Sequence, residues 1–123
     1  MADSREPTLR VTMLPRDTNA LGTIFGGVIL SHIDLAGGVA AAREARRHFV
    51  TRAMREVEFI APVYVGDVVS FYTSLQRRGT TSLTIRVEVE AERFNEPGHN
   101  VRVTAAEVVY VAIDEAGKPL LIR

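Results

Sequence analysis

The stretch from residue 26 to residue 42 constrains the fold of this chain more than any other, because it is apolar on every face of a helix. Ile29, Ile33 and Ala36 keep the i, i+4, i+7 spacing of one helical face. The other faces carry residues such as Leu35 and Val39 rather than polar groups. A helix that is apolar all round is a buried helix, so the rest of the chain must enclose it.

The sequence on either side of this helix shows the period of two that is typical of strands. The clearest case is Leu83, Ile85, Val87 and Val89, which alternate with polar residues and predict one buried and one solvated face. Turn residues such as Gly, Pro and Asp separate the segments. The predicted strands cover residues 9–14, 50–61, 68–76, a segment around 83–89, and 101–114.

The order of these elements indicates the fold class. One strand and one buried helix come first, and four strands joined by short turns follow, which we expect to form an antiparallel meander. The economical arrangement is α+β: a hotdog fold, in which an antiparallel sheet wraps around one long buried helix. A single sheet of this kind leaves edge strands exposed, so we expect the chain to pair with a second copy.

Length and charge exclude several classes of protein. The 123 residues fit one domain, so we take residues 1–123 as a single unit, with residues 1–8 as a loose N-terminal segment. The absence of cysteine excludes a disulfide framework, a thiolate zinc site and a thiol nucleophile. With 15 basic and 15 acidic residues the formal net charge is zero, which argues against nucleic-acid binding. The polar N-terminus and short apolar runs predict no signal peptide and no membrane span, and hence a cytoplasmic protein.

Asp34 is the residue that fits least well in a buried helix. A buried carboxylate without partners is costly, so Asp34 must be paired or protonated, or it must line a cavity. Gly37 and Gly38 each cost about 1 kcal/mol relative to Ala in a helix, which indicates that something approaches closely there. The alternative is structural, because Ser31 and Asp34 match a capping box that would start the helix near Ser31.

Three residues just before and at the start of the helix could also take part in chemistry. Gly26 and Gly27 offer backbone N–H groups at a helix N-terminus, which favours negative charge and could hold a carbonyl oxygen. Asn19 lies in the preceding loop and could orient a water or a carbonyl. The structural alternatives are a tight turn for the glycines and a turn cap for the asparagine.

A charged turn is the last candidate site. The segment Arg77-Arg78-Gly79-Thr80-Thr81-Ser82 combines two cations, a flexible glycine and three hydroxyls, and it could hold phosphates. The alternative is an ordinary hairpin turn. The three histidines have no metal-ligand spacing and suggest no Ser-His-Asp set, so we expect no metal site.

Taken together, these segments closely resemble the hotdog-fold acyl-CoA thioesterases of the acyl-CoA hydrolase family. The resemblance covers nearly the whole chain in order and rests on several motifs rather than on any single one. The matching stretches are residues 13–27 (MLPRDTNALGTIFGG), 33–38 (IDLAGG), 50–51 (VT), 59–69 (FIAPVYVGDVV), 79–82 (GTTS) and 111–119 (VAIDEAGKP).

The resemblance implies roles for the candidate residues. Asp34 corresponds to the catalytic carboxylate of the family, and Asn19 to an asparagine that faces it across a subunit interface. Gly26 and Gly27 lie where the family polarises the thioester carbonyl. The turn residues Gly79, Thr80, Thr81 and Ser82 fall in the segment that contacts coenzyme A. The family often has Arg where this chain has Thr80, so Arg77 or Arg78 would supply the cation.

The expected function is therefore an acyl-CoA thioesterase that hydrolyses acyl-CoA to free fatty acid and coenzyme A. Asp34 would act as general base or as nucleophile, and Val28, Leu30 and Ile33 would shape the acyl tunnel. No cofactor is expected, because coenzyme A is part of the substrate. The resemblance implies a tetramer or hexamer with active sites at the dimer interface. Two rivals remain: a hotdog hydratase or dehydratase, and a non-catalytic acyl-CoA-binding or regulatory protein.

Overall fold

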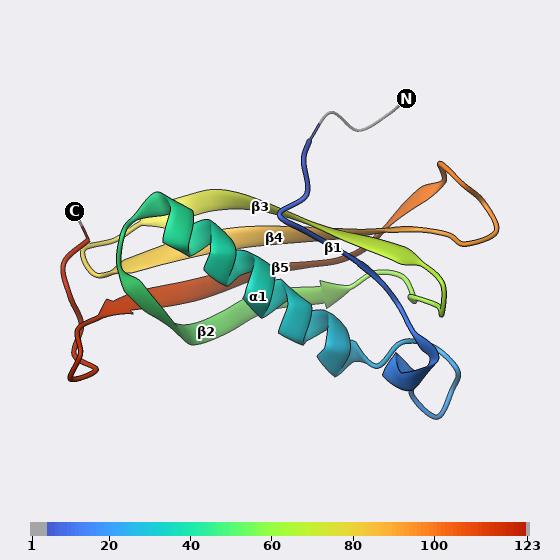
Figure 1. Ribbon diagram of the computed structural model, residues 1–123, viewed down its shortest axis with the longest axis horizontal. Coiled ribbons are helices and arrows are strands. Elements are labelled where there is room, and N and C mark those ends of the chain that lie inside the picture. The colour runs from blue at the N-terminus through green and yellow to red at the C-terminus, as the bar shows by residue number, and fades with distance from the viewer. Residues whose placement is uncertain (1–4, 123) are drawn as a thin grey trace.

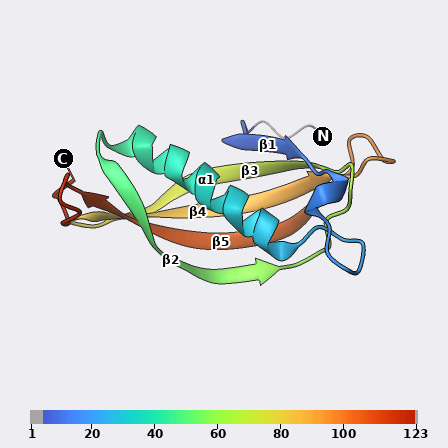
Figure 2. The same ribbon diagram turned by 60° about the horizontal axis from the view of Figure 1, so that its bottom comes forward.

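The computed structural model describes residues 5–122, in which one helix packs on a five-stranded antiparallel sheet (Figure 1). The helix crosses one face of the sheet, and the strands curve around it (Figure 2). In chain order the elements are β1 (Leu9–Thr12), the 3-10 turn η1 (Pro15–Asp17), α1 (Gly26–Glu44), β2 (His48–Phe59), β3 (Val68–Arg78), β4 (Ser82–Glu92) and β5 (Asn100–Ile113).

The strand order departs from the predicted four-strand meander. The sheet runs β1-β3-β4-β5-β2, so β3, β4 and β5 form a meander but β2 pairs with β5 instead of β3. The prediction was wrong because residues 60–67 are a crossing segment and not a tight turn. Ile60 N donates to Val103 O on the β5 side (2.8 Å), whereas Gly66 N donates to Met13 O next to β1 (2.9 Å). The segment thus carries the chain from one edge of the sheet to the other.

The core lies between α1 and the inner face of the sheet. The predicted alternation in β4 is confirmed, because Leu83, Ile85, Val87 and Val89 are all 0% exposed. Two bulges interrupt the pairing of β2 with β5, and Glu56 in the second has a positive φ of 54°. Bulges bend a strand and increase its twist, which suits a sheet that curls around a helix.

The helix is buried on one side only, contrary to the prediction that it is buried all round. Ile33 and Ala36 are 0% exposed on the side that faces the sheet, but Leu35 is 61% exposed and Val39 is 43% exposed. A single five-stranded sheet covers one side of a helix and cannot enclose it. The apolar outer side of α1 is therefore a surface that this chain alone leaves in water.

The helix begins at Gly26, which rules out the capping-box interpretation. Ser31 lies inside the helix, and its hydroxyl donates to Val28 O (2.8 Å) instead of capping a terminus. The predicted close approach is confirmed at Gly37, where a Cβ would collide with the Tyr110 hydroxyl. At Gly38 a Cβ would meet nothing within 4 Å.

The N-terminal segment is anchored from residue 5 onward. Arg5 pairs with Glu88 (3.2 Å) and Glu90 (2.8 Å) of β4, and Thr8 N donates to Phe71 O in β3 (2.8 Å). Residues 1–4, the rest of the segment that we expected to be loose, lie outside the described part of the chain. Within residues 5–122 no helix has the length and hydropathy needed to cross a membrane.

Candidate active site

Two hydroxyl groups hold the carboxylate of Asp34 on α1. Thr51 Oγ1 in β2 donates to Asp34 Oδ1 at 2.6 Å. The Tyr110 hydroxyl in β5 lies 2.8 Å from the backbone O of Asp34 and 3.2 Å from its Oδ1. Both hydroxyls contact the same carboxylate oxygen, Oδ1, so Oδ2 is the oxygen that we expect to meet water or substrate.

The register of the sheet places these two hydroxyls side by side. Thr51 and Tyr110 are directly paired residues of β2 and β5, and paired residues point to the same face of a sheet. Their shared face is the one against which α1 packs, with Gly37 leaving room for the tyrosine ring. Asp34, one helical turn before Gly37, therefore meets both hydroxyls at once.

Both side-chain partners of the Asp34 carboxylate are neutral hydroxyls. Among the ion pairs of residues 5–122 none involves Asp34. Burial, together with the nearby Asp34 charge and the hydrogen bond to it, raises the pKa of the Tyr110 hydroxyl well above its usual range. Tyr110 therefore stays protonated at neutral pH and remains a donor to the carboxylate.

An open cavity of about 450 Å³ lies over this carboxylate. Its walls include Leu35 and Val39 from the exposed side of α1, Phe49 from β2, and Arg47 from the segment between them. The apolar surface that the single chain leaves uncovered thus surrounds the carboxylate. The carboxylate lies in a half-open site rather than in the sealed core.

Gly26 and Gly27 lie at the start of α1, as predicted, and no side chain caps this terminus. Gly26 lines a second cavity of about 280 Å³. A Cβ at Gly26 would touch the Phe59 ring at 3.4 Å, and one at Gly27 would meet the Phe25 ring at 2.5 Å. Gly27 and Asp34 are seven residues apart, which separates their backbones by about 10 Å along the helix.

The side chain of Asn19 forms hydrogen bonds within its own loop. Its Oδ1 accepts from Leu21 N (2.8 Å) and Thr23 N (3.2 Å), and its Nδ2 donates to Thr23 Oγ1 (2.9 Å). The structure of one chain does not bring Asn19 to Asp34. The asparagine does fix the loop that leads into Gly26 and Gly27.

The turn at residues 77–82 lies apart from the Asp34 cavity in this chain, because none of its residues lines that cavity. Arg78 pairs with Glu44 at the end of α1 (3.9 Å), and Gly79 N donates to Ser82 O (2.7 Å). Thr80 O accepts from Ile122 N (3.1 Å), and Thr81 O from Ala112 N (2.8 Å). The turn is thus fixed to the C-terminal tail. In the same tail, the backbone O of Leu121 accepts a hydrogen bond from Nε of Arg47, which lines the Asp34 cavity (3.0 Å).

Sequence reasoning missed the roles of Thr51 and Tyr110. Their only signals were the Val50-Thr51 match in the resemblance and the Gly37-Gly38 pair, which required a close neighbour without naming it. The proposed tunnel residues Val28, Leu30 and Ile33 line neither of the two cavities described above, whereas Ile29 lines the one beside Gly26. His32 stacks on Phe71 with ring centroids 5.8 Å apart, and its Nδ1 contacts Val28 O at 2.8 Å.

The comparisons with known proteins agree on one family. The model of the thioesterase superfamily matches residues 21–96. Over 116 residues the chain is 42% identical to acyl-CoA thioester hydrolase YciA of Salmonella typhimurium, covering 93% of this chain and 87% of that protein. For the residues described here, no group of three or more potential ligands could hold a metal ion.

Solved structures give the same result for the fold. A hexameric hotdog-fold thioesterase of Campylobacter jejuni superposes with a TM-score of 0.91 at 41% identity, covering 99% of this chain and 93% of that one. A hexameric thioesterase of Yersinia pestis has a TM-score of 0.91 at 37% identity and covers 100% and 99%. The predicted hotdog fold is thereby confirmed.

Proposed function

The chain belongs to the thioesterase superfamily and hydrolyses acyl-CoA thioesters, and on that premise we propose that Asp34 is its catalytic carboxylate. The observation that carries the proposal is the environment of Asp34. Two neutral hydroxyls hold one of its oxygens, no ion pair among residues 5–122 involves it, and an open cavity lies over it. A carboxylate within reach of substrate and water can act as a general base.

The proposed reaction needs only water, the substrate and the protein. Asp34 acts as general base through Oδ2 while the oxygen of the water bonds to the carbonyl carbon. The carbon–sulfur bond then breaks, the acid keeps the oxygen of the water, and the proton passes to the thiolate of coenzyme A. If Asp34 were instead a nucleophile, a single turnover in oxygen-18 water would place the label in its carboxylate when water opens the anhydride at Asp34.

The oxygen of the thioester requires its own donors, and Gly26 and Gly27 supply them at the uncapped start of α1. They cannot serve Asp34 of the same chain. The two are about 10 Å apart along the helix, whereas the carbonyl oxygen and the attacked carbon of a thioester are directly bonded. We therefore propose that each site joins Asp34 of one protomer to Gly26, Gly27 and Asn19 of another.

The exposed apolar surfaces support this arrangement. Leu21 is 88% exposed and Phe25 is 58% exposed in the segment that carries Asn19 and leads to Gly27. Leu35 and Val39, 61% and 43% exposed, flank Asp34. A two-fold interface would bury the first pair against the second in both directions and complete two sites. Because the similar thioesterases of C. jejuni and Y. pestis are hexamers, we propose a hexamer here.

We also propose that the turn at 77–82 contacts the coenzyme A moiety. In one chain it lies away from the cavity, but Arg77 and Arg78 are exposed and Gly79 lets the backbone turn tightly. The cations would meet the phosphates of the nucleotide, and no further cofactor is required. The hydratase alternative is disfavoured because His32 packs on Phe71, away from Asp34.

The first test measures thiol release from acyl-CoA esters by the purified protein. The wild type should release thiol, and Asp34→Ala should lower kcat/KM by about 10²–10⁴-fold, the range that a general base contributes. The variant should keep its circular dichroism spectrum and its size in solution. Equal rates for the two proteins would refute the role of Asp34, and binding of the esters without any thiol release would favour the regulatory alternative.

A mixing experiment tests the sharing of sites. Asp34→Ala and Asn19→Ala chains are unfolded separately, combined in equal amounts and refolded. In a mixed dimer one site receives both lesions and the other receives none, so random pairing restores about a quarter of the wild-type activity. If Asp34 and Asn19 act within one chain, the mixture stays as inactive as its parents.

A further inference from the structure

The cavity beside the start of α1 contains a buried hydroxyl without a partner. Thr104 in β5 lines this cavity and is 0% exposed. Across residues 5–122 its Oγ1 is the one buried side-chain polar atom that lacks a hydrogen bond. A buried polar group is normally paired, and leaving it unpaired costs stability. A hydrogen-bonding atom of a ligand in this cavity would therefore stabilise the Thr104 hydroxyl.

The rest of the cavity is apolar. Its lining includes Ile24, Ile29, Phe59 and Val63, and among the described lining residues Thr104 provides the only polar side chain. The cavity measures about 280 Å³, and an apolar cavity of about 150 Å³ already admits benzene. It is thus large enough for a short acyl group, with one hydrogen-bonding position in its wall.

The sheet register aims this hydroxyl toward the helix. Thr104 is paired with Val89 of β4 and with Phe59 of β2, both of which face α1. Gly26 borders the same cavity at the uncapped helix N-terminus. A thioester whose oxygen lies at Gly26 and Gly27 would direct its acyl chain into the cavity and toward Thr104.

We propose that Thr104 makes the enzyme prefer acyl groups that carry an oxygen substituent over unsubstituted chains of the same length. A hydroxyl on the acyl chain completes the hydrogen bonding of Thr104 Oγ1, whereas a hydrocarbon chain leaves that oxygen buried and unpaired. A site that hydrogen-bonds a polar substituent strongly rejects the substrate analogue that lacks this substituent. An apolar pocket rejects a substrate with an added polar group much less strongly. The inference rests on the proposed function, because it takes the substrate carbonyl to lie at the start of α1.

The test compares kcat/KM for butyryl-CoA with kcat/KM for its 2-, 3- and 4-hydroxy derivatives, so that the position of the oxygen is sampled. The wild type should favour at least one hydroxy derivative over butyryl-CoA. Thr104→Val keeps the β-branched shape and removes the hydroxyl, and it should lower that preference about 10-fold. Thr104→Ser should keep the preference.

Thr84→Val is the matched control. Thr84 is also buried in the sheet, at 4% exposed, but it is paired with Val109 on the other face and does not line the cavity. This variant should leave the preference unchanged. A wild type that hydrolyses all four esters without preferring a hydroxy derivative, or a Thr104→Val ratio within twofold of the wild type, overturns the inference while leaving the thioesterase function intact. No thiol release from any ester refutes the function itself, and the inference with it.

Discussion

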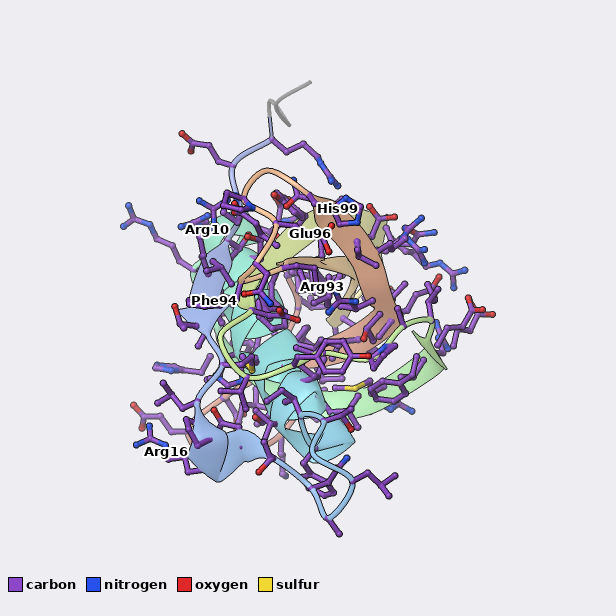
Figure 3. All side chains as sticks on the ribbon, turned by 90° about the vertical axis from the view of Figure 1, so that its right-hand side faces the viewer. Arg10, Arg16, Arg93, Phe94, Glu96 and His99 are labelled. Atoms are coloured by element: carbon purple, nitrogen blue, oxygen red, sulfur yellow. The ribbon has the colours of Figure 1, made fainter. Side chains whose placement is uncertain are left out.

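Asp67 and Asp34 are two carboxylates held inside the same fold by opposite means. Asp67 is 2% exposed, and its Oδ2 accepts from Arg93 (2.6 Å) and from Tyr64 N (2.9 Å). Arg93 also donates to Pro62 O (2.9 Å) and lies over the Tyr64 ring, 4.9 Å from its centroid. In the end-on view of Figure 3, Arg93 lies near the centre while Arg10 and Arg16 lie at the periphery.

Asp34 has neutral hydroxyl partners, and no ion pair of residues 5–122 involves it. The difference shows how one side-chain type serves two purposes. A buried carboxylate whose Oδ2 is matched to a cation and to a backbone N–H is structural, and it fixes the crossing segment at residues 60–67. A carboxylate held by neutral hydroxyls beside an open cavity is accessible to substrate and water, which makes it useful in a reaction.

The largest expected contrast is in stability. Asp67→Ala should lower the free energy of unfolding by about 3–5 kcal/mol, because it leaves the mostly buried guanidinium of Arg93 without its counter-ion. Asp34→Ala should change it by less than about 1 kcal/mol, because no cation is left unpaired. Urea unfolding of both variants measures this. Similar losses of unfolding free energy in the two variants would show that Asp34 and Asp67 do not differ in their contribution to stability.

An intermediate effect is expected on activity when the support of Asp34 is weakened. Thr51→Val removes the 2.6 Å hydrogen bond to Oδ1 and should lower kcat about 10-fold at nearly constant KM, because bonds to charged groups are the stronger kind. Thr51→Ser should restore most of the rate. Thr51 is then a positioning residue, and a loss that appears only in KM would contradict that role.

The smallest effect concerns the response of stability to alkaline pH. The pKa of Tyr110 is raised in the folded state, whereas an unfolded tyrosine titrates near pH 10. Above about pH 10 the unfolded chain therefore loses a proton that the folded chain keeps, and the free energy of unfolding falls as pH rises. One proton limits the slope to about 1.4 kcal/mol per pH unit.

Tyr110→Phe should lose this part of the slope, which urea unfolding at pH 8 and pH 10.5 would detect as a smaller difference than in the wild type. The other groups that titrate in this pH range are present in both the wild type and the variant. The difference between the two slopes therefore reports the contribution of Tyr110 alone. Identical slopes would mean that Tyr110 titrates alike in the two states, contrary to the hydrogen bond with Asp34.

Most of the secondary structure could be predicted because it depends on local pattern. The period of two around Leu83 to Val89 reflects one buried and one solvated face, and the helix follows from apolar residues at helical spacing. The position of β2 could not be read in this way. A period of two indicates a strand without naming its neighbour, and the crossing at residues 60–67 is fixed by contacts with Met13 and Val103.

The candidate site was predictable only in part, for a related reason. Asp34 stood out because a charge in an apolar helix requires an explanation. Its partners Thr51 and Tyr110 depend on how α1 lies over the sheet, and Tyr110 is distant in the chain. Thr104 is an unremarkable threonine within a strand until the cavity shows that its hydroxyl has no partner.

The pairing of β2 with β5 also bears on the time course of folding. The hairpins β3–β4 and β4–β5 each join strands that are consecutive in the chain. Strand β2, in contrast, pairs with β5, and both β3 and β4 lie between these two strands in the sequence, so β2 must wait for β5. Strands that are distant in the sequence pair slowly, because the entropy of closing the loop between them is lost before their contacts form. Thr51 belongs to β2, so Asp34 receives this hydroxyl only when the final strand docks. We expect the newly made chain to be inactive before this pairing forms.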